Sequence, residues 1–265
     1  MSSRRISRRQ AVAALAAAPF ANVPRFDPFG VAPATFVLVH GAWHGGWCWT
    51  RVSPLLRAAG YTVFTPTLTG LGERSHLLRR DVDLDMHITD IVQVLEFEDL
   101  EKVILVGHSY GGMVITGVAD KASNRISQLV YLDAMLPENG KAITDYSQRK
   151  YAPITEDSWH DPAAEPQDYG VTDARDVAWV KKRLRDMPRK CMTQPLRLAD
   201  DNSRRVKGAF ILCSNRPFAV EAAQRAKQRG YAYRELLSAG HDAMVTRPRE
   251  LTTILNDLAS GSRSR

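Results

Sequence analysis

Cysteine is scarce in this sequence and follows no recognisable spacing. The 265 residues include three cysteines, Cys48, Cys191 and Cys213, so at most one disulfide bond can form. Their wide separation excludes a disulfide framework and a cysteine-based metal cluster. Cys213 ends an apolar run, which favours a buried small side chain over a reactive thiol.

A long hydrophobic run is also missing. Hydrophobic residues make up 44% of the chain and charged residues 25%, which is typical of a soluble globular protein and excludes disordered, collagen-like and membrane-embedded classes. No stretch resembles a spacer between two independent domains. At this length we expect one domain with an insertion.

Basic residues are in excess, but they form no nucleic-acid signature. The formal net charge is +7, and several of the arginines fall in the first nine residues and the last few, outside the expected fold. No basic run alternates with aromatic residues, and no zinc-finger spacing occurs. We therefore expect a solvated basic surface with no nucleic-acid partner and no membrane partner, and the sequence leaves the oligomeric state open.

The N-terminal segment has the pattern of an export signal. Arg8 and Arg9 precede the alanine-rich run 11–18, which resembles the paired arginines and short apolar region of a twin-arginine signal. That run is too short to span a bilayer, which takes about 20 apolar residues. We expect residues 1–34 to be an export signal and linker of a periplasmic or secreted protein; the alternative is a basic tail on a cytoplasmic one.

Short apolar runs alternate with helix-like segments along the rest of the chain. A continuous apolar run ended by a glycine or a polar residue is typical of a strand buried on both faces of a parallel sheet. The alternation predicts an α/β fold with a mostly parallel, doubly wound sheet. The expected strands cover 35–39, 61–64, 103–106, 129–132, 209–212 and 233–237, and the expected helices cover 52–59, 88–97, 113–119, 219–228 and 250–258.

One segment interrupts this alternation. Residues 134–195 are rich in proline, aspartate, tryptophan and charge, and they contain no convincing strand. We therefore expect a mostly helical lid inserted between the two parts of the core, 35–133 and 196–265.

A nucleophile motif follows the third expected strand. Residues 107–111 read Gly-His-Ser-Tyr-Gly, directly after an apolar strand and directly before a helix-like segment. This context is typical of a nucleophile elbow, in which small residues permit a strained turn that exposes the serine hydroxyl. The motif predicts Ser109 as a nucleophile, whereas without these flanks it would be an ordinary glycine turn. We expect His108 to pack within the elbow.

A serine hydroxyl needs a general base, and one histidine has the right place in the chain. His241 follows the last expected strand, beside the loop residue Gly240, and the other six histidines lack this order. The reaction also needs donors for an oxyanion. We expect these to be the backbone N–H groups of Tyr110, after the nucleophile, and Ala42, in the glycine-rich loop after the first strand.

Three motifs together resemble a known family. They are His-Gly-Ala-Trp-His-Gly-Gly-Trp at 40–47, Gly-His-Ser-Tyr-Gly-Gly at 107–112 and Gly-His-Asp-Ala-Met at 240–244. They look like the plant methylesterase and hydroxynitrile lyase family of α/β-hydrolases and its bacterial esterase relatives, including pyrethroid hydrolases. The resemblance implies a lidded α/β-hydrolase fold and an apolar pocket, with neither a metal ion nor an organic cofactor.

The chain departs from that family at two places. The family's lyases carry a lysine after the catalytic histidine, where this chain has Asp242, and the family's acid usually follows the penultimate strand, where this chain has Asn215 and Arg216. We predict Asp133 as the acid instead, because it follows the strand 129–132 and strand ends on that side of the sheet converge on the active site. Asp242 is the rival, and Asn215 could orient the imidazole without supplying charge.

Three functions fit these residues. The first is hydrolysis of a small, largely apolar carboxylic ester through an acyl-enzyme at Ser109. The second is carbon–carbon cleavage of a cyanohydrin, against which Asp242 argues, and the third is a ligand-binding relative without catalysis. The candidates for the substrate pocket are Trp43, His44, Met135, Trp159 and Met244. Each is of a type that is equally common in protein cores.

Overall fold

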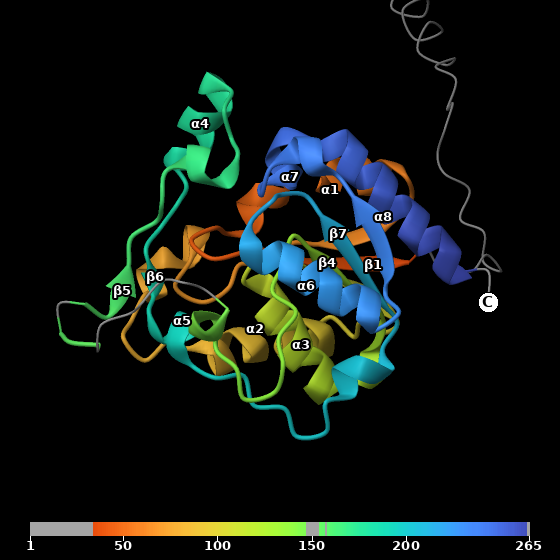
Figure 1. The fold of residues 1–265 in the computed structure, drawn as a ribbon, viewed down its shortest axis with the longest axis horizontal. Helices are drawn as coiled ribbons and strands as arrows, with labels where there is room; N and C mark the ends of the chain where they lie inside the picture. The colour runs from red at the N-terminus through yellow and green to blue at the C-terminus, as the bar shows by residue number, and fades with distance from the viewer. Residues whose placement is uncertain (1–33, 147–153, 157, 264–265) are drawn as a thin grey trace, which may run out of the picture. The chain divides into compact units, whose positions relative to one another are not determined.

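The computed structural model describes residues 34–146, 154–156 and 158–263, so the expected export segment lies almost wholly outside the described residues. Six strands form one sheet in the order β2-β1-β3-β4-β7-β8, and every pairing within it is parallel. The predicted parallel α/β sheet is therefore confirmed (Figure 1). Its strands are β1 (Thr35–Val39), β2 (Thr62–Phe64), β3 (Val103–His108), β4 (Ile126–Leu132), β7 (Gly208–Leu212) and β8 (Ala232–Glu235).

Alternate residues of the central strands face opposite sides of the sheet. In β1, Phe36 and Leu38 belong to one apolar cluster, whereas Val37 and Val39 belong to the other. All four side chains are fully buried. Burial on both faces explains why these strands read as continuous apolar runs rather than as an alternating pattern.

Helices cover both faces of the sheet (Figure 1). The side chains of α2, α3 and α6 join the cluster that contains Val37, and those of α1, α7 and α8 join the cluster that contains Phe36. Helix α2 begins earlier than expected because the Asp83 carboxylate accepts the backbone N–H of Met86 at 3.0 Å and caps the first turn. The helices are α1 (Ser53–Ala58), α2 (Leu84–Phe97), α3 (Gly111–Ala122), α6 (Pro217–Gln228), α7 (Ala243–Thr246) and α8 (Pro248–Arg263).

The inserted segment 134–195 is less helical than expected. Its described residues contain two α-helices, α4 (Ala174–Lys181) and the short α5 (Lys190–Thr193), two 3-10 turns (Ile143–Asp145 and Pro166–Tyr169), and a two-stranded antiparallel ladder of β5 (His160–Asp161) and β6 (Met187–Pro188). Proline recurs in the segment and disfavours long helices, because it lacks an N–H and clashes with the preceding turn.

Polar contacts tie this segment to the core. The Arg51 guanidinium donates to both carboxylate oxygens of Asp176 in α4, at 3.0 and 2.5 Å. The indole N–H of Trp43 donates to the backbone carbonyl of Asp161 at 3.1 Å. The insertion is thus anchored on both sides of the loop that follows β1. Across the described part of the chain, no helix combines the length and apolar character that a membrane crossing needs.

Candidate active site

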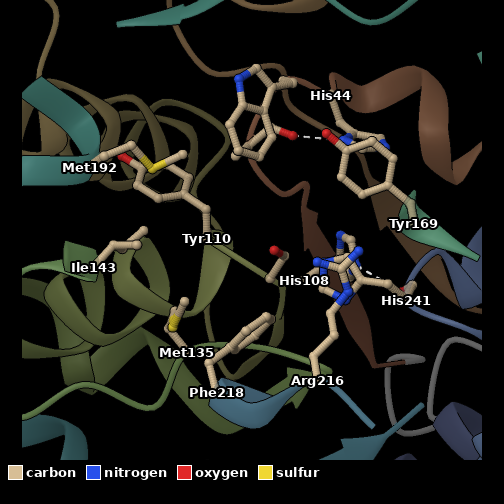
Figure 2. A pocket seen from close by; sticks show the side chains of 13 residues that line it. His44, His108, Tyr110, Met135, Ile143, Tyr169, Met192, Arg216, Phe218 and His241 are labelled. Carbon is tan, nitrogen blue, oxygen red and sulfur yellow. Dashed lines mark hydrogen bonds between the residues drawn. The ribbon is translucent and has the colours of Figure 1, made fainter. Parts of the chain in front are cut away.

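A cavity of about 230 Å³ lies at the carboxyl edge of the sheet, where open α/β sheets bind their ligands (Figure 2). Loops after β1, β3, β4, β7 and β8 supply most of its wall, and the inserted segment supplies the rest. In Figure 2, apolar side chains gather on one side of the cavity and histidines on the other. The lining residues are Ala42, Trp43, His44, His108, Ser109, Tyr110, Met135, Ile143, Tyr169, Met192, Arg216, Phe218 and His241.

Ser109 occupies a strained turn between β3 and α3. Its φ is +54°, in the left-handed region that side chains other than glycine rarely adopt. A Cβ at Gly107 would lie 2.6 Å from the carbonyl oxygen of Gly111, so the turn admits only glycine there. The backbone carbonyl of Ser109 accepts N–H groups from Gly112 at 3.1 Å and Met135 at 3.0 Å, which hold the strained conformation.

His241 and Asp133 form a short buried hydrogen bond. His241 Nδ1 lies 2.6 Å from Asp133 Oδ2, and the two side chains are 4% and 0% exposed. Because a carboxylate oxygen can only accept, Nδ1 carries the proton and donates it. In the neutral imidazole Nε2 is then an acceptor, which is the tautomer that a general base for a serine hydroxyl requires.

Asp133 is held by donors on both of its oxygens. Oδ1 accepts the backbone N–H groups of Cys213 at 2.8 Å and Ser214 at 2.9 Å, and Oδ2 accepts the Ser214 hydroxyl at 2.5 Å beside His241. Burial opposes ionisation of this carboxyl, but its hydrogen bonds with His241 and Ser214 outweigh burial and hold its pKa below the usual range. The carboxylate therefore stays ionised beside His241.

Backbone N–H groups of Ala42 and Tyr110 are free to bind an oxyanion. Both residues line the cavity with Ser109. Within the described residues, neither N–H donates to a protein acceptor. Tyr110 is the N-cap of α3, where the first N–H groups of a helix have no partner inside the helix. The arrangement fits the two donors expected from the sequence.

Asp242 binds a different histidine from the one beside it in the sequence. Its Oδ2 accepts from His44 Nε2 at 2.9 Å, and His44 Nδ1 lies 2.7 Å from the carbonyl oxygen of Ala42. Both ring nitrogens of His44 thus face acceptors that cannot donate, so both carry protons and the ring is an imidazolium. The rival assignment, in which Asp242 orients His241, does not fit this geometry.

The pKa values of this pair agree with an ion pair. Burial favours the neutral acid, but the charge of His44 and its hydrogen bond lower the pKa of Asp242 to about 2. Burial also favours a neutral imidazole, yet the charge of Asp242 outweighs it and raises the pKa of His44. The two charges stabilise one another in a site that excludes water.

His108 packs within the elbow as expected, and it also lines the cavity. Its Nε2 donates to the backbone carbonyl of His241 at 3.0 Å. Burial, with the neighbouring His241, lowers the pKa of His108 well below its usual range, so this ring is neutral.

The structure brings only part of the predicted substrate pocket together. Trp43, His44 and Met135 line the cavity, although both nitrogens of His44 are already engaged by the protein. Trp159 and Met244 do not line it; Met244 is fully buried in the core, and Trp159 lies outside the cavity, next to β5.

Sequence reasoning missed five other lining residues. Arg216 and Phe218 follow β7, so the rule that strand ends converge on the site would have found them. The other three, from the inserted segment, carry no sequence pattern that marks them: Ile143, Tyr169 and Met192.

The described side chains include no group of three or more histidine, cysteine, aspartate or glutamate residues arranged to hold a metal ion. The buried histidines near the site bond instead to carboxylates and carbonyl groups of the protein. All three cysteines are buried and free.

Comparison with known proteins places this site in a family. A model described as "Alpha/beta hydrolase family" matches residues 36–253. The chain is 40% identical to a carbendazim hydrolyzing esterase of Nocardioides sp. (strain SG-4G), over 82% of this chain and 96% of the relative. It is 29% identical to salicylic acid-binding protein 2 of Nicotiana tabacum, over 84% of this chain and 96% of the relative. It is 26% identical to methylesterase 3 of Arabidopsis thaliana, over 84% of this chain and 95% of the relative.

Solved structures share the fold. An extracellular α/β-hydrolase from a Paenibacillus species is similar with a TM-score of 0.70, at 20% identity, over 85% of this chain and 98% of that one. A pyrethroid hydrolase from Sphingobium faniae is similar with a TM-score of 0.66, also at 20% identity, over 88% of this chain and 99% of that one.

Proposed function

Because this chain belongs to the α/β hydrolase family and is an esterase-type hydrolase like its named relatives, we propose that it cleaves a small, largely apolar carboxylic ester through an acyl-enzyme at Ser109. The observation that carries this proposal is the 2.6 Å hydrogen bond between His241 and the buried Asp133, in one cavity with Ser109. Ser109, His241 and Asp133 would then act as nucleophile, base and acid, the three roles that serine hydrolysis uses.

Each residue has one task in the proposed reaction. Ser109 Oγ attacks the ester carbonyl while His241 Nε2 takes its proton, and Asp133 stabilises the imidazolium that forms. The N–H groups of Ala42 and Tyr110 bind the developing oxyanion. His241 then gives its proton to the leaving alcohol, and a water molecule, activated by the same ring, releases the acid.

The cavity supports a small substrate. Its volume of about 230 Å³ is below the usual range of about 300–1,000 Å³ for sites that bind drug-sized ligands. Met135, Ile143 and Met192 make one side of it apolar (Figure 2). The name of the 40% identical relative makes carbendazim one compound for a substrate panel.

Two alternatives lack an observation in their favour. A lyase of the resembled family would use a lysine after His241, but Asp242 stands there; it is bound to His44 and does not itself line the cavity. A receptor without catalysis has no need of the strained Ser109 turn or the paired His241.

Rapid mixing with a chromogenic ester tests the proposal. We expect a burst of alcohol release, followed by steady turnover, and labelling of Ser109 by a fluorophosphonate. Ser109→Ala will lower kcat by more than about 10³-fold without changing the melting temperature, because the substitution removes one oxygen from a partly exposed side chain. A folded Ser109→Ala variant that keeps more than a few per cent of activity would refute the nucleophile. An unlabelled, inactive wild type would instead favour the receptor.

A further inference from the structure

Among the described residues that line the cavity, Arg216 is the one with a permanently charged side chain. The other lining residues are apolar, aromatic, hydroxyl-bearing or histidine, and no aspartate or glutamate is among them. Figure 2 shows the Arg216 side chain extending toward the imidazoles of His108 and His241. An arginine in this position is exposed to whatever the cavity binds.

The Arg216 guanidinium has no acceptor among the described residues. Its backbone N–H lies 3.4 Å from the Ser214 hydroxyl, but its side chain makes only one contact, over the ring of Tyr169 at 5.8 Å. That distance is near the outer limit of about 6 Å for a cation–π interaction. By contrast, Arg51 and Arg189 each donate twice to a carboxylate. The donors of Arg216 are therefore available to a ligand.

The nearby carboxylates already have partners within the protein. Asp133 accepts four hydrogen bonds, and Asp242 is paired with the imidazolium of His44. An anionic group that enters the cavity therefore meets one unpaired cation and no free carboxylate. The aromatic side chains of Tyr169 and Phe218 lie in the same cavity wall and lower the local dielectric, which strengthens a charge interaction.

We propose that Arg216 binds a carboxylate on the substrate, so that the preferred substrates are half-esters: molecules with an apolar middle, one scissile ester and one ionised acid group. This inference rests on the function proposed above and adds its substrate class. The planar fork of a guanidinium matches a carboxylate through two parallel hydrogen bonds, which gives both affinity and orientation. The second acid group takes no part in the chemistry and is released unchanged.

Matched pairs of esters test this proposal. The substrates are the monomethyl and dimethyl esters of succinic, glutaric and adipic acid, whose chain lengths sample the distance between Ser109 and Arg216. We expect kcat/KM for the monomethyl ester to exceed that for the dimethyl ester by at least about tenfold at one or more lengths, since a charge-assisted bidentate contact is worth more than about 1.4 kcal/mol. The advantage will shrink as salt concentration rises.

Three variants assign the effect to one side chain. Arg216→Gln will lower kcat/KM for the half-esters by at least about tenfold more than for the dimethyl esters, which removes the half-ester advantage. Arg216→Lys will keep part of it, because the charge remains but the fork is lost. Arg234→Gln, at an exposed arginine of β8 away from the cavity, is the matched control and will leave both values unchanged.

The outcomes separate this proposal from the one on which it rests. A wild type that prefers dimethyl esters at every length, or an Arg216→Gln variant that loses both classes equally, overturns the role of Arg216 and leaves serine hydrolysis intact. Failure of the serine mechanism shows instead as an active Ser109→Ala variant on dimethyl esters. If Arg216→Gln does not fold, the wild-type preference, its salt dependence and Arg216→Lys decide.

Discussion

His44 and Asp242 form a buried ion pair directly behind the loop that carries one proposed oxyanion donor. Nε2 of His44 lies 2.9 Å from Oδ2 of Asp242, and Nδ1 of the same ring holds the carbonyl of Ala42 at 2.7 Å. Asp242 is also the chain neighbour of His241. One dipeptide therefore supplies the proposed general base, His241, and a partner, Asp242, for the histidine that holds the proposed oxyanion loop.

Asp133→Asn should lower kcat by about 10³–10⁴-fold with little change in KM. All four groups around the Asp133 carboxylate are hydrogen-bond donors. The NH₂ group of an asparagine in its place would therefore face a donor and could not form a hydrogen bond with it. If His241 then accepts at Nδ1, its proton moves to Nε2 and the ring cannot act as a base. Steady-state kinetics on a reactive ester measures the effect.

Asp242→Asn is the control for that variant. Its amide oxygen can still accept from His44, so we expect a loss of kcat below about tenfold, because only the charge is removed. Near-normal kcat in Asp133→Asn, together with a severe loss in Asp242→Asn, would transfer the acid role to Asp242.

The His44–Asp242 pair should contribute a pH-dependent part of stability. The pKa of His44 is raised above about 6.5, so its contribution is complete below that pH and is lost as pH rises through the folded-state pKa. Asp242 contributes above its unfolded pKa of about 3.9 and loses its contribution as pH falls toward a folded pKa of about 2. The pair is therefore most stabilising between roughly pH 4 and 6.5.

His44→Gln tests this by chemical denaturation at several pH values. We expect the variant to be less stable than the wild type by about 3–5 kcal/mol near pH 6, the usual cost of removing one partner of a buried pair. The difference will shrink as pH rises through the raised folded-state pKa of His44, where the wild-type ring loses its charge. Comparing the two proteins cancels the opposite contribution of His87, whose pKa burial lowers. His40 and His108, whose pKa values burial and the charge of His44 both lower, lose the smaller of these causes in the variant. A difference that does not change with pH would contradict the charged state of His44.

Gly112→Ala should destabilise the elbow. A Cβ at Gly112 would lie 2.0 Å from the carbonyl oxygen of Met135, whose N–H holds the carbonyl of Ser109. We expect a loss of about 1–3 kcal/mol in unfolding free energy, with a lower kcat. Gly261→Ala, in α8 with nothing within 4 Å of its Cβ, should have the opposite sign and gain up to about 1 kcal/mol. Equal effects of the two substitutions would exclude a close approach at Gly112.

We propose that the leader directs export. Replacing Arg8 and Arg9 with lysine should retain the protein in the cytoplasm of a host that has the twin-arginine pathway, because the signal depends on the arginine pair. Cell fractionation measures this, and equal cytoplasmic retention of wild type and variant would leave the leader as a basic tail.

The sheet could be predicted because each of its strands can be recognised from its own residues. Runs such as Thr35–Val39 are buried on both faces, so their apolar character is visible without knowledge of their partners. The Ser109 turn and the position of Asp133 follow from the same logic, since both residues come directly after strands whose ends converge. The 2.6 Å contact between Asp133 and His241 agrees with the acid predicted from the sequence.

The inserted segment could not be predicted in this way. Its short helices and its two-residue strands have no period, and their positions depend on long-range contacts such as Arg51 with Asp176. The pairing of His44 with Asp242 joins residues 198 positions apart and has no sequence signature. The prediction that Met244 lines the substrate pocket is wrong. Its side chain packs in the core behind the site, although its sequence position is close to His241.

Because Asp133 lies at the end of β4, the loop after β7 does not have to supply the acid. That loop supplies two backbone N–H groups to the carboxylate, from Cys213 and Ser214, and backbone donors persist whatever side chains follow. Residues 215 and 216 thus have no duty in proton transfer. Substitutions at these two positions leave the proposed nucleophile and base in place. In descendants of this enzyme, substrate specificity can therefore change independently of turnover.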